Sequence, residues 1–126
     1  MLKPIIAIAI GSTIGGVFRW ILSNKFNSLF VIPFGTLLSN LIAGYIIGFA
    51  MTFLANSPTI SPEWRLLIIT GFCGGLSTFS TFSAEIVMFL QKGQITLGLS
   101  TIAVHVIGSI LMTLLGIFSY QLIKGM

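Results

Sequence analysis

Four long apolar stretches, separated by short polar segments, fill almost the whole chain of 126 residues. They lie near 4–23, 32–56, 64–90 and 96–123, and only 6% of all residues are charged. A helix of about 20 mainly apolar residues crosses a hydrocarbon core of about 30 Å, whereas a soluble domain needs a more polar surface. The sequence therefore predicts an all-α membrane protein, with four transmembrane helices in one domain, 1–126.

Reactive side chains are too sparse to assemble most catalytic sites. The candidate acid–base groups are Glu63, Glu85 and His105, and the single Cys73 excludes an intramolecular disulfide or a multi-cysteine metal site. No phosphate-binding loop followed by Lys and Ser or Thr is present. The basic residues are scattered and form no patch for nucleic acid. We predict that the chain is neither an enzyme nor a nucleic-acid-binding protein, and that its surroundings are a lipid bilayer.

The basic residues divide evenly between the two faces expected for four spans. One face would carry Lys3, Arg65 and Lys124, and the other Arg19, Lys25 and Lys92. The positive-inside rule needs an imbalance to set orientation, so the chain is predicted to insert both ways and to pair as a dual-topology antiparallel homodimer. The alternative is that a tie among six charges is accidental.

A run of glycines and hydroxyls, residues 71–82, interrupts the third apolar stretch. Glycine weakens helices, and hydroxyl side chains within a membrane need a partner, an ion or water. We therefore predict that the third helix is broken in the middle. Carbonyls released at such a break coordinate cations such as sodium in transporters, and the stretch 74–77 is a candidate for this role.

Small residues recur at the four-residue spacing that brings helices into close contact. The pairs are Gly11 with Gly15, Gly44 with Gly48, and Gly71 with Gly75. Their spacing does not distinguish contacts within one chain from contacts between two chains.

Several side chains within the spans are suited to an anion. Phe79 and Phe82 share a helix face, and the edge of a phenylalanine ring carries partial positive charge; the alternative is that they are ordinary core residues. Asn40 places an amide donor at membrane depth. Arg19 either draws anions toward a vestibule or extends to the membrane interface. Glu85 is predicted to continue a polar stripe with Thr78 and Thr81 along one face.

Three motifs together resemble the Fluc (CrcB) fluoride channels of bacteria. They are Gly15-Gly-Val-Phe-Arg19, Thr36-Leu-Leu-Ser-Asn40 and the run 71–82, and the likeness extends over the whole chain. The resemblance implies a fluoride-selective channel in the bacterial inner membrane. Such a channel exports fluoride passively, lowers its toxicity in the cytoplasm, and works as an antiparallel homodimer with a structural sodium ion at the interface.

The resemblance also implies roles for individual residues. The carbonyls of Gly74 and Ser77 would bind the sodium ion from each subunit. The fluoride pathway would include Asn40, Phe79, Phe82, Ser80, Thr81 and Arg19, with Ser109 and Thr113 as further donors.

Two other functions are compatible with a short four-helix chain. A small dual-topology, proton-coupled multidrug exporter needs a buried carboxylate in its first helix, and residues 4–23 contain no acid. A non-transporting, helix-packing subunit of a larger complex would explain the glycines but not the hydroxyl run. Fluoride transport accounts for both features.

Overall fold

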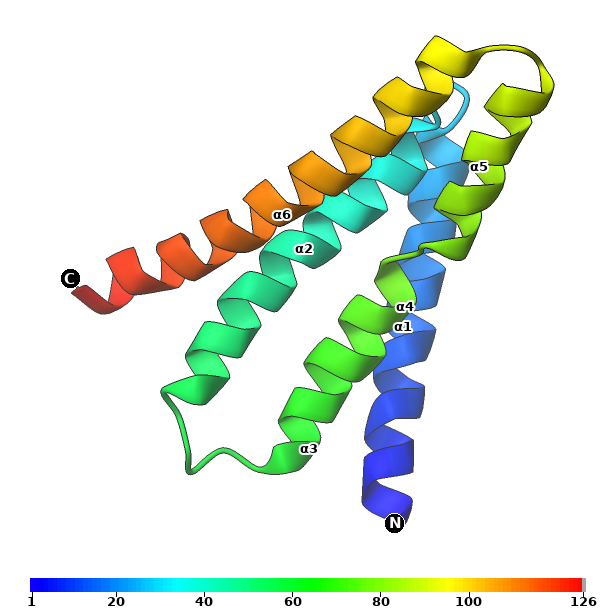
Figure 1. Cartoon of the computed structure of the whole chain (residues 1–126). Helices are drawn as coiled ribbons and strands as arrows, with labels where there is room; N and C mark the ends of the chain where they lie inside the picture. Colours follow the sequence, from blue (N-terminus) through cyan, green and yellow to red (C-terminus); the bar gives the residue numbers. More distant parts are fainter. Residues whose placement is uncertain (126) are drawn as a thin grey trace.

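A computed structural model describes residues 1–125, and its elements are all helical (Figure 1). In chain order they are α1 (Leu2–Phe26), α2 (Phe34–Ala55), α3 (Pro62–Arg65), the π-helical segment η1 (Leu66–Cys73), α4 (Gly74–Leu76), α5 (Ser80–Gln91) and α6 (Ile95–Gly125). The segments α3, η1, α4 and α5 together make the third span, Pro62–Gln91. The described residues thus contain four segments that are long and apolar enough to cross a membrane, which confirms the predicted fold class.

The observed helices extend beyond three of the four predicted stretches. The first helix covers Leu2–Phe26 instead of 4–23, and the last covers Ile95–Gly125 instead of 96–123. The third span starts at Pro62, where the missing amide of proline costs no helical hydrogen bond. Hydropathy marks only the apolar part of a helix, whereas the backbone bonds continue into polar residues at its ends.

The helices pack as two pairs, α6 on α2 and α1 on the first half of the third span. Figure 1 shows α6 lying along α2, while α1 runs beside η1 and α4, and α5 leans toward the first half of α6. The connections 27–33 and 92–94 lie at the opposite end from the N-terminus and from the connection between α2 and α3. An even number of spans therefore returns the chain to the side on which it began.

Glycines bring the backbones of these pairs into direct contact. A Cβ on Gly15 would collide with the carbonyl of Phe72, and one on Gly75 would lie 2.6 Å from the carbonyl of Ser12. Between α2 and α6, a Cβ on Gly48 would collide with the carbonyl of Thr113. The question that the sequence left open is thus answered: each of the three predicted glycine pairs packs against another helix of the same chain.

A small buried cluster fixes the third span just before its break. Leu76, the last residue of α4, is fully buried and packs with Leu22 of α1 and Ala43 of α2. These contacts come from two different helices, so the end of α4 has a defined position. The site described below is built on this anchored helix end.

Candidate functional site

The third span is broken at Ser77–Phe79, between α4 and α5. Ser77 has extended backbone angles, φ −77° and ψ 155°, and helix resumes at Ser80. The break was predicted within 71–82, and the structure places it at 77–79, because Gly74–Leu76 remain helical. Gly71 and Gly75 pack closely on α1, and the chain unwinds only after the anchored Leu76.

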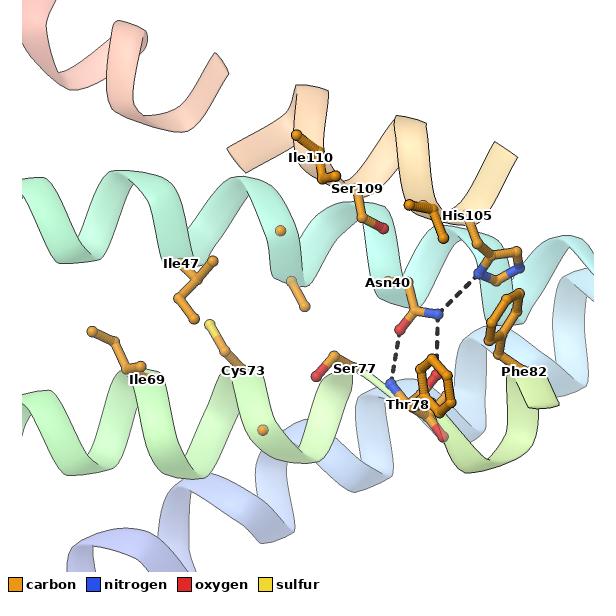
Figure 2. A pocket seen from close by; sticks show the side chains of 15 residues that line it. Asn40, Ile47, Ile69, Cys73, Ser77, Thr78, Phe82, His105, Ser109 and Ile110 are labelled. Atoms are coloured by element: carbon orange, nitrogen blue, oxygen red, sulfur yellow. Dashed lines mark hydrogen bonds between the residues drawn. The ribbon is translucent and has the colours of Figure 1, made fainter. Parts of the chain in front are cut away.

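Asn40 of α2 holds the unwound segment through both backbone groups of one residue. The amide of Thr78 donates to Asn40 Oδ1 at 2.7 Å, and Asn40 Nδ2 donates to the carbonyl of Thr78 at 3.2 Å. A second hydrogen bond from Asn40 Nδ2 joins Nδ1 of His105 on α6 at 3.0 Å (Figure 2). One amide side chain therefore links α2, the break and α6, and both of its N–H groups are engaged within the chain.

Arg19 of α1 is half-buried and binds the last turn before the break. Its Nε donates to the carbonyl of Gly75 at 3.1 Å. A helix ends with carbonyls that lack intrahelical partners, and a cationic donor there also offsets the negative end of the helix dipole. Arg19 thus caps α4, and neither interpretation that the sequence suggested for it predicted this contact.

Thr78, in the unwound segment, stabilises the start of α5. The amide of Thr81 donates to Thr78 Oγ1 at 3.2 Å, and the hydroxyls of Thr78 and Ser80 lie 3.5 Å apart. Thr78 therefore lies in the unwound segment and not on a helix face with Glu85. The continuous polar stripe predicted from Thr78 through Thr81 to Glu85 is wrong at its first member, because the helix that would align these residues begins only at Ser80.

A cavity of about 450 Å³ opens beside the break, between α2, the third span and α6. Its lining includes four residues of the predicted fluoride pathway, namely Asn40, Phe79, Phe82 and Ser109. Both predicted sodium ligands, Gly74 and Ser77, line it as well. None of the described lining residues is Lys, Arg, Asp or Glu. The cavity therefore offers amide, hydroxyl and aromatic groups without a fixed charge.

Two phenylalanines and a histidine form a chain of rings at one end of this cavity. The rings of Phe79 and Phe82 meet edge to face, with centroids 5.4 Å apart, and the ring of Phe82 lies 4.5 Å from that of His105. Phe82 is buried, whereas 77% of Phe79 is exposed. The two phenylalanines thus share one wall, but only Phe79 projects into open space.

Four other residues of the predicted pathway do not line this cavity, namely Arg19, Ser80, Thr81 and Thr113. Ser80 is exposed on the first turn of α5. Thr113 donates its hydroxyl to the carbonyl of Ser109 on its own helix at 3.0 Å. Their assignment to a fluoride pathway stays a prediction.

A second polar pair joins α2 to α5 about one helical turn away from Asn40. The hydroxyl of Thr36, which is almost fully buried, donates to Oε2 of Glu85 at 2.6 Å. The other carboxylate oxygen, Oε1, is buried and has no partner among the described residues. Glu85 also lines a cavity of about 160 Å³ that includes Lys92. The sequence suggested a polar role for Glu85, but it did not identify Thr36 as its partner.

His105 contributes to the site through a partner that the sequence did not identify. A lone histidine in the last span is more often a packing or hydrogen-bonding residue than a proton relay, and His105 is 3% exposed and binds Asn40 at the break. A signal was available, because Asn40 and His105 each place a polar side chain within an apolar span. Such groups need partners, and each was the best candidate for the other.

The fold and the site define a multi-pass helical membrane protein with a broken third span beside a cavity lined by uncharged side chains. The model of the CrcB-like protein family, described as Camphor Resistance (CrcB), matches residues 6–117. The chain therefore belongs to this family.

Relatives with curated names resemble the chain over nearly its whole length. It is 64% identical over 126 residues to the "Fluoride-specific ion channel FluC" of Nitrosomonas europaea, with 99% of each chain covered. Proteins of the same name from Pseudomonas syringae and Pseudomonas aeruginosa are 57% and 58% identical, again with at least 98% of each chain covered. The match includes the break and the helices that surround it.

Proposed function

We propose that this chain is a fluoride-selective channel of the bacterial cell membrane, which exports fluoride passively and so lowers its concentration in the cytoplasm. The observation that carries the proposal is the uncharged cavity at the break, where Phe79, Phe82 and Ser109 present ring edges and a hydroxyl. Relatives at 53–64% identity bear the name of a fluoride-specific channel. The multidrug exporter is not favoured, because α1 contains no acidic residue.

Ion passage requires groups that replace the hydration of fluoride without trapping it. Hydroxyl donors and ring edges stabilise an anion through partial charges, so each site is favourable but can be left. With the cell interior negative, the membrane potential contributes about 2.3 kcal/mol per charge per 100 mV toward anion exit. Hydrogen fluoride that enters from acid surroundings would ionise inside, and the channel would release the resulting fluoride.

Fluoride efflux from proteoliposomes, recorded with a fluoride electrode, tests the proposed function. Vesicles loaded with potassium fluoride should release it when valinomycin allows potassium to follow, and chloride-loaded vesicles should release far less. A matched preparation without protein gives the leak. Equal chloride and fluoride efflux, or efflux no faster than the leak, would contradict fluoride selectivity.

We further infer that the working unit is an antiparallel homodimer whose second copy covers the break. In the single chain Gly74, Ser77 and Phe79 are exposed, and a Cβ on Gly74 would find no neighbour closer than 3.9 Å. Unwound backbone does not face lipid, because its polar groups would have no partners there. A protein surface must therefore cover it, and a second copy supplies one.

The distribution of charge supports either orientation in the membrane. Because Arg19 is half-buried and binds the carbonyl of Gly75, five basic residues remain for the membrane faces. They divide three to two, with Lys3, Arg65 and Lys124 on one side and Lys25 and Lys92 on the other. A difference of one charge is too small for the positive-inside rule to favour one orientation strongly.

A structural sodium ion at the two-fold axis belongs to the same proposal. The amide of Thr78 would normally close a helical bond to the carbonyl of Gly74, but it donates to Asn40 instead. The Gly74 carbonyl, on the exposed side of α4, thereby loses that partner. The next carbonyl, of Gly75, is held by Arg19. The carbonyls of Gly74 and Ser77 from two antiparallel copies would supply oxygen ligands, as broken transporter helices do for sodium.

Cross-linking with and without sodium tests the dimer and its ion together. A cysteine at position 77, in a Cys73→Ser background, should form a disulfide-linked dimer in a bilayer when sodium is present. Replacing sodium with N-methylglucamine should reduce this cross-linking at least about threefold, because an ion that binds only the dimer stabilises it. Val17→Cys in the same background is the control, since Val17 is exposed on α1. Equal cross-linking at positions 17 and 77 would contradict the dimer, and sodium-independent cross-linking at 77 would contradict the ion.

A further inference from the structure

A second cavity, of about 360 Å³, lies between α1 and the start of the third span. It shares no lining residue with the cavity at the break. Figure 1 shows the start of α1 and the short helix α3 at the same end of the bundle, and the two helices are in contact. Because a span begins at the membrane surface, this cavity lies at the level where lipid headgroups meet the hydrocarbon core.

Both walls of this cavity change from charged to apolar in the same direction. On α1, Lys3 is followed one and two turns later by Ala7 and Ile10. On the third span, Glu63 is followed one turn later by Leu67. Residues at these spacings lie on one face of a helix. The cavity therefore has charged groups at its outer end and aliphatic groups toward the bilayer centre, which is the order of groups along a phospholipid.

Close helix packing ends the apolar part of the cavity. A Cβ on Gly11 would collide with the carbonyl of Leu67, so α1 and the third span touch directly at this level. Ala7 is buried between them, whereas Ile6 and Ile10 remain exposed. The result is a groove that is closed at its inner end and open along one side, as an acyl chain entering from the bilayer requires.

The outer end of the groove carries one positive and one negative side chain. Lys3 is exposed and Glu63 is partly exposed, and no ion pair joins them. The exposed Trp64 lies beside them and has an indole N–H that can donate a hydrogen bond. Tryptophan and lysine are typical of the membrane interface. The two opposite charges match a headgroup that itself carries both signs.

We propose that this groove binds a zwitterionic phospholipid with a primary ammonium group, phosphatidylethanolamine. Lys3 binds the phosphate, Glu63 accepts a hydrogen bond from the ammonium, and one acyl chain lies against Ile6, Ile10 and Leu67. The lipid site is independent of ion passage, because none of these residues lines the cavity at the break.

The charges of the groove select against the two other common headgroup types. Phosphatidylglycerol has a phosphate but no cation, so Glu63 would repel it and gain no partner. Phosphatidylcholine has both charges, but its trimethylated ammonium has no N–H for the carboxylate. Charge-assisted hydrogen bonds are stronger than bonds between neutral groups, so the primary ammonium is favoured.

Native mass spectrometry of the full chain in detergent measures this preference. The protein is titrated with phosphatidylethanolamine, phosphatidylcholine or phosphatidylglycerol of identical acyl chains. We expect phosphatidylethanolamine to bind about threefold to fivefold more tightly than either of the others, as for one exposed ion pair, and to saturate at one molecule per chain. Equal binding of the three lipids would overturn the proposal.

Neutralising each charge separately tests its assignment. Glu63→Gln should reduce binding of phosphatidylethanolamine to the level of phosphatidylglycerol, whereas Lys3→Gln should weaken the binding of both. Lys25→Gln is the matched control, because Lys25 is an exposed lysine in the last turn of α1 and does not line the groove. An unchanged preference in Glu63→Gln, or an equal loss in Lys25→Gln and Lys3→Gln, would contradict a specific site.

A variant of the apolar part tests the groove without changing its charges. Ile6 is exposed, so Ile6→Trp should fill the groove and leave the folded core intact, which thermal unfolding in detergent would verify. Binding of phosphatidylethanolamine should fall about threefold or more, because the acyl chain can no longer bury apolar surface there. Unchanged binding in this variant would show that the lipid does not occupy the groove.

Discussion

Asn40→Leu is expected to collapse the break and with it the fluoride pathway. Leucine matches asparagine in size but removes three hydrogen bonds, two to the backbone of Thr78 and one to His105. Each partner left unpaired away from water costs about 1–3 kcal/mol. We therefore expect the free energy of unfolding to fall by about 3 kcal/mol or more, since the costs at neighbouring groups partly overlap.

Thermal unfolding in detergent and fluoride efflux from proteoliposomes measure this effect. Asn56→Leu is the matched control, because Asn56 is the residue directly after α2 and its side chain makes only exposed hydrogen bonds, to Thr52 and from Lys124. The control should change stability by only about 0.5 kcal/mol. If Asn40→Leu were as stable as Asn56→Leu and still transported fluoride, Asn40 would not hold the break.

Phe79→Ile is expected to lower fluoride efflux about 10- to 100-fold, equivalent to about 1.4–2.7 kcal/mol at the limiting barrier. Phe79 is 77% exposed and projects from the break into the cavity, where its ring edge can face an ion. Isoleucine preserves an apolar side chain but has no electropositive edge. Because the ring is exposed in the single chain, its loss should affect the folding of one subunit little.

A second phenylalanine provides the control for this substitution. Phe118 is 52% exposed on α6 and does not line the cavity at the break, so Phe118→Ile should retain wild-type efflux. Size-exclusion chromatography would verify that both variants keep the oligomeric state of the wild type. Unchanged efflux in Phe79→Ile would remove the ring-edge mechanism and leave the channel function standing.

The site was predictable where chemistry is local and unpredictable where it depends on a distant partner. The residues near the break were identified because glycines and hydroxyls are unusual within an apolar span. The partner of Arg19 could not be predicted, since it is a backbone carbonyl 56 positions away, and no pattern in the sequence identifies backbone acceptors. The partner of His105 was not predicted for the same reason, because its bond to Asn40 joins residues 65 positions apart.

The exact residue at which the third span unwinds also depended on contacts with distant residues. The run of glycines and hydroxyls placed the break within 71–82, and packing decided where in this run it lies. Gly71 and Gly75 meet α1 so closely that their lack of a side chain is required for contact, and Leu76 is buried between α1 and α2. The third span stays helical through Leu76, the last residue that makes these contacts. The helix ends at Ser77, after which the amide of Thr78 binds Asn40 instead of a helical carbonyl.

The sequence by itself determined the four spans, the membrane environment and the interrupted third helix. These features follow from hydropathy and helix propensity, which are properties of neighbouring residues. Only the tertiary structure decided which glycines meet which helix, where the third span unwinds, and that Asn40, Arg19 and His105 converge on the break. Within a membrane each exposed polar group must find a partner, and that partner is set by how the helices pack, not by its place along the chain.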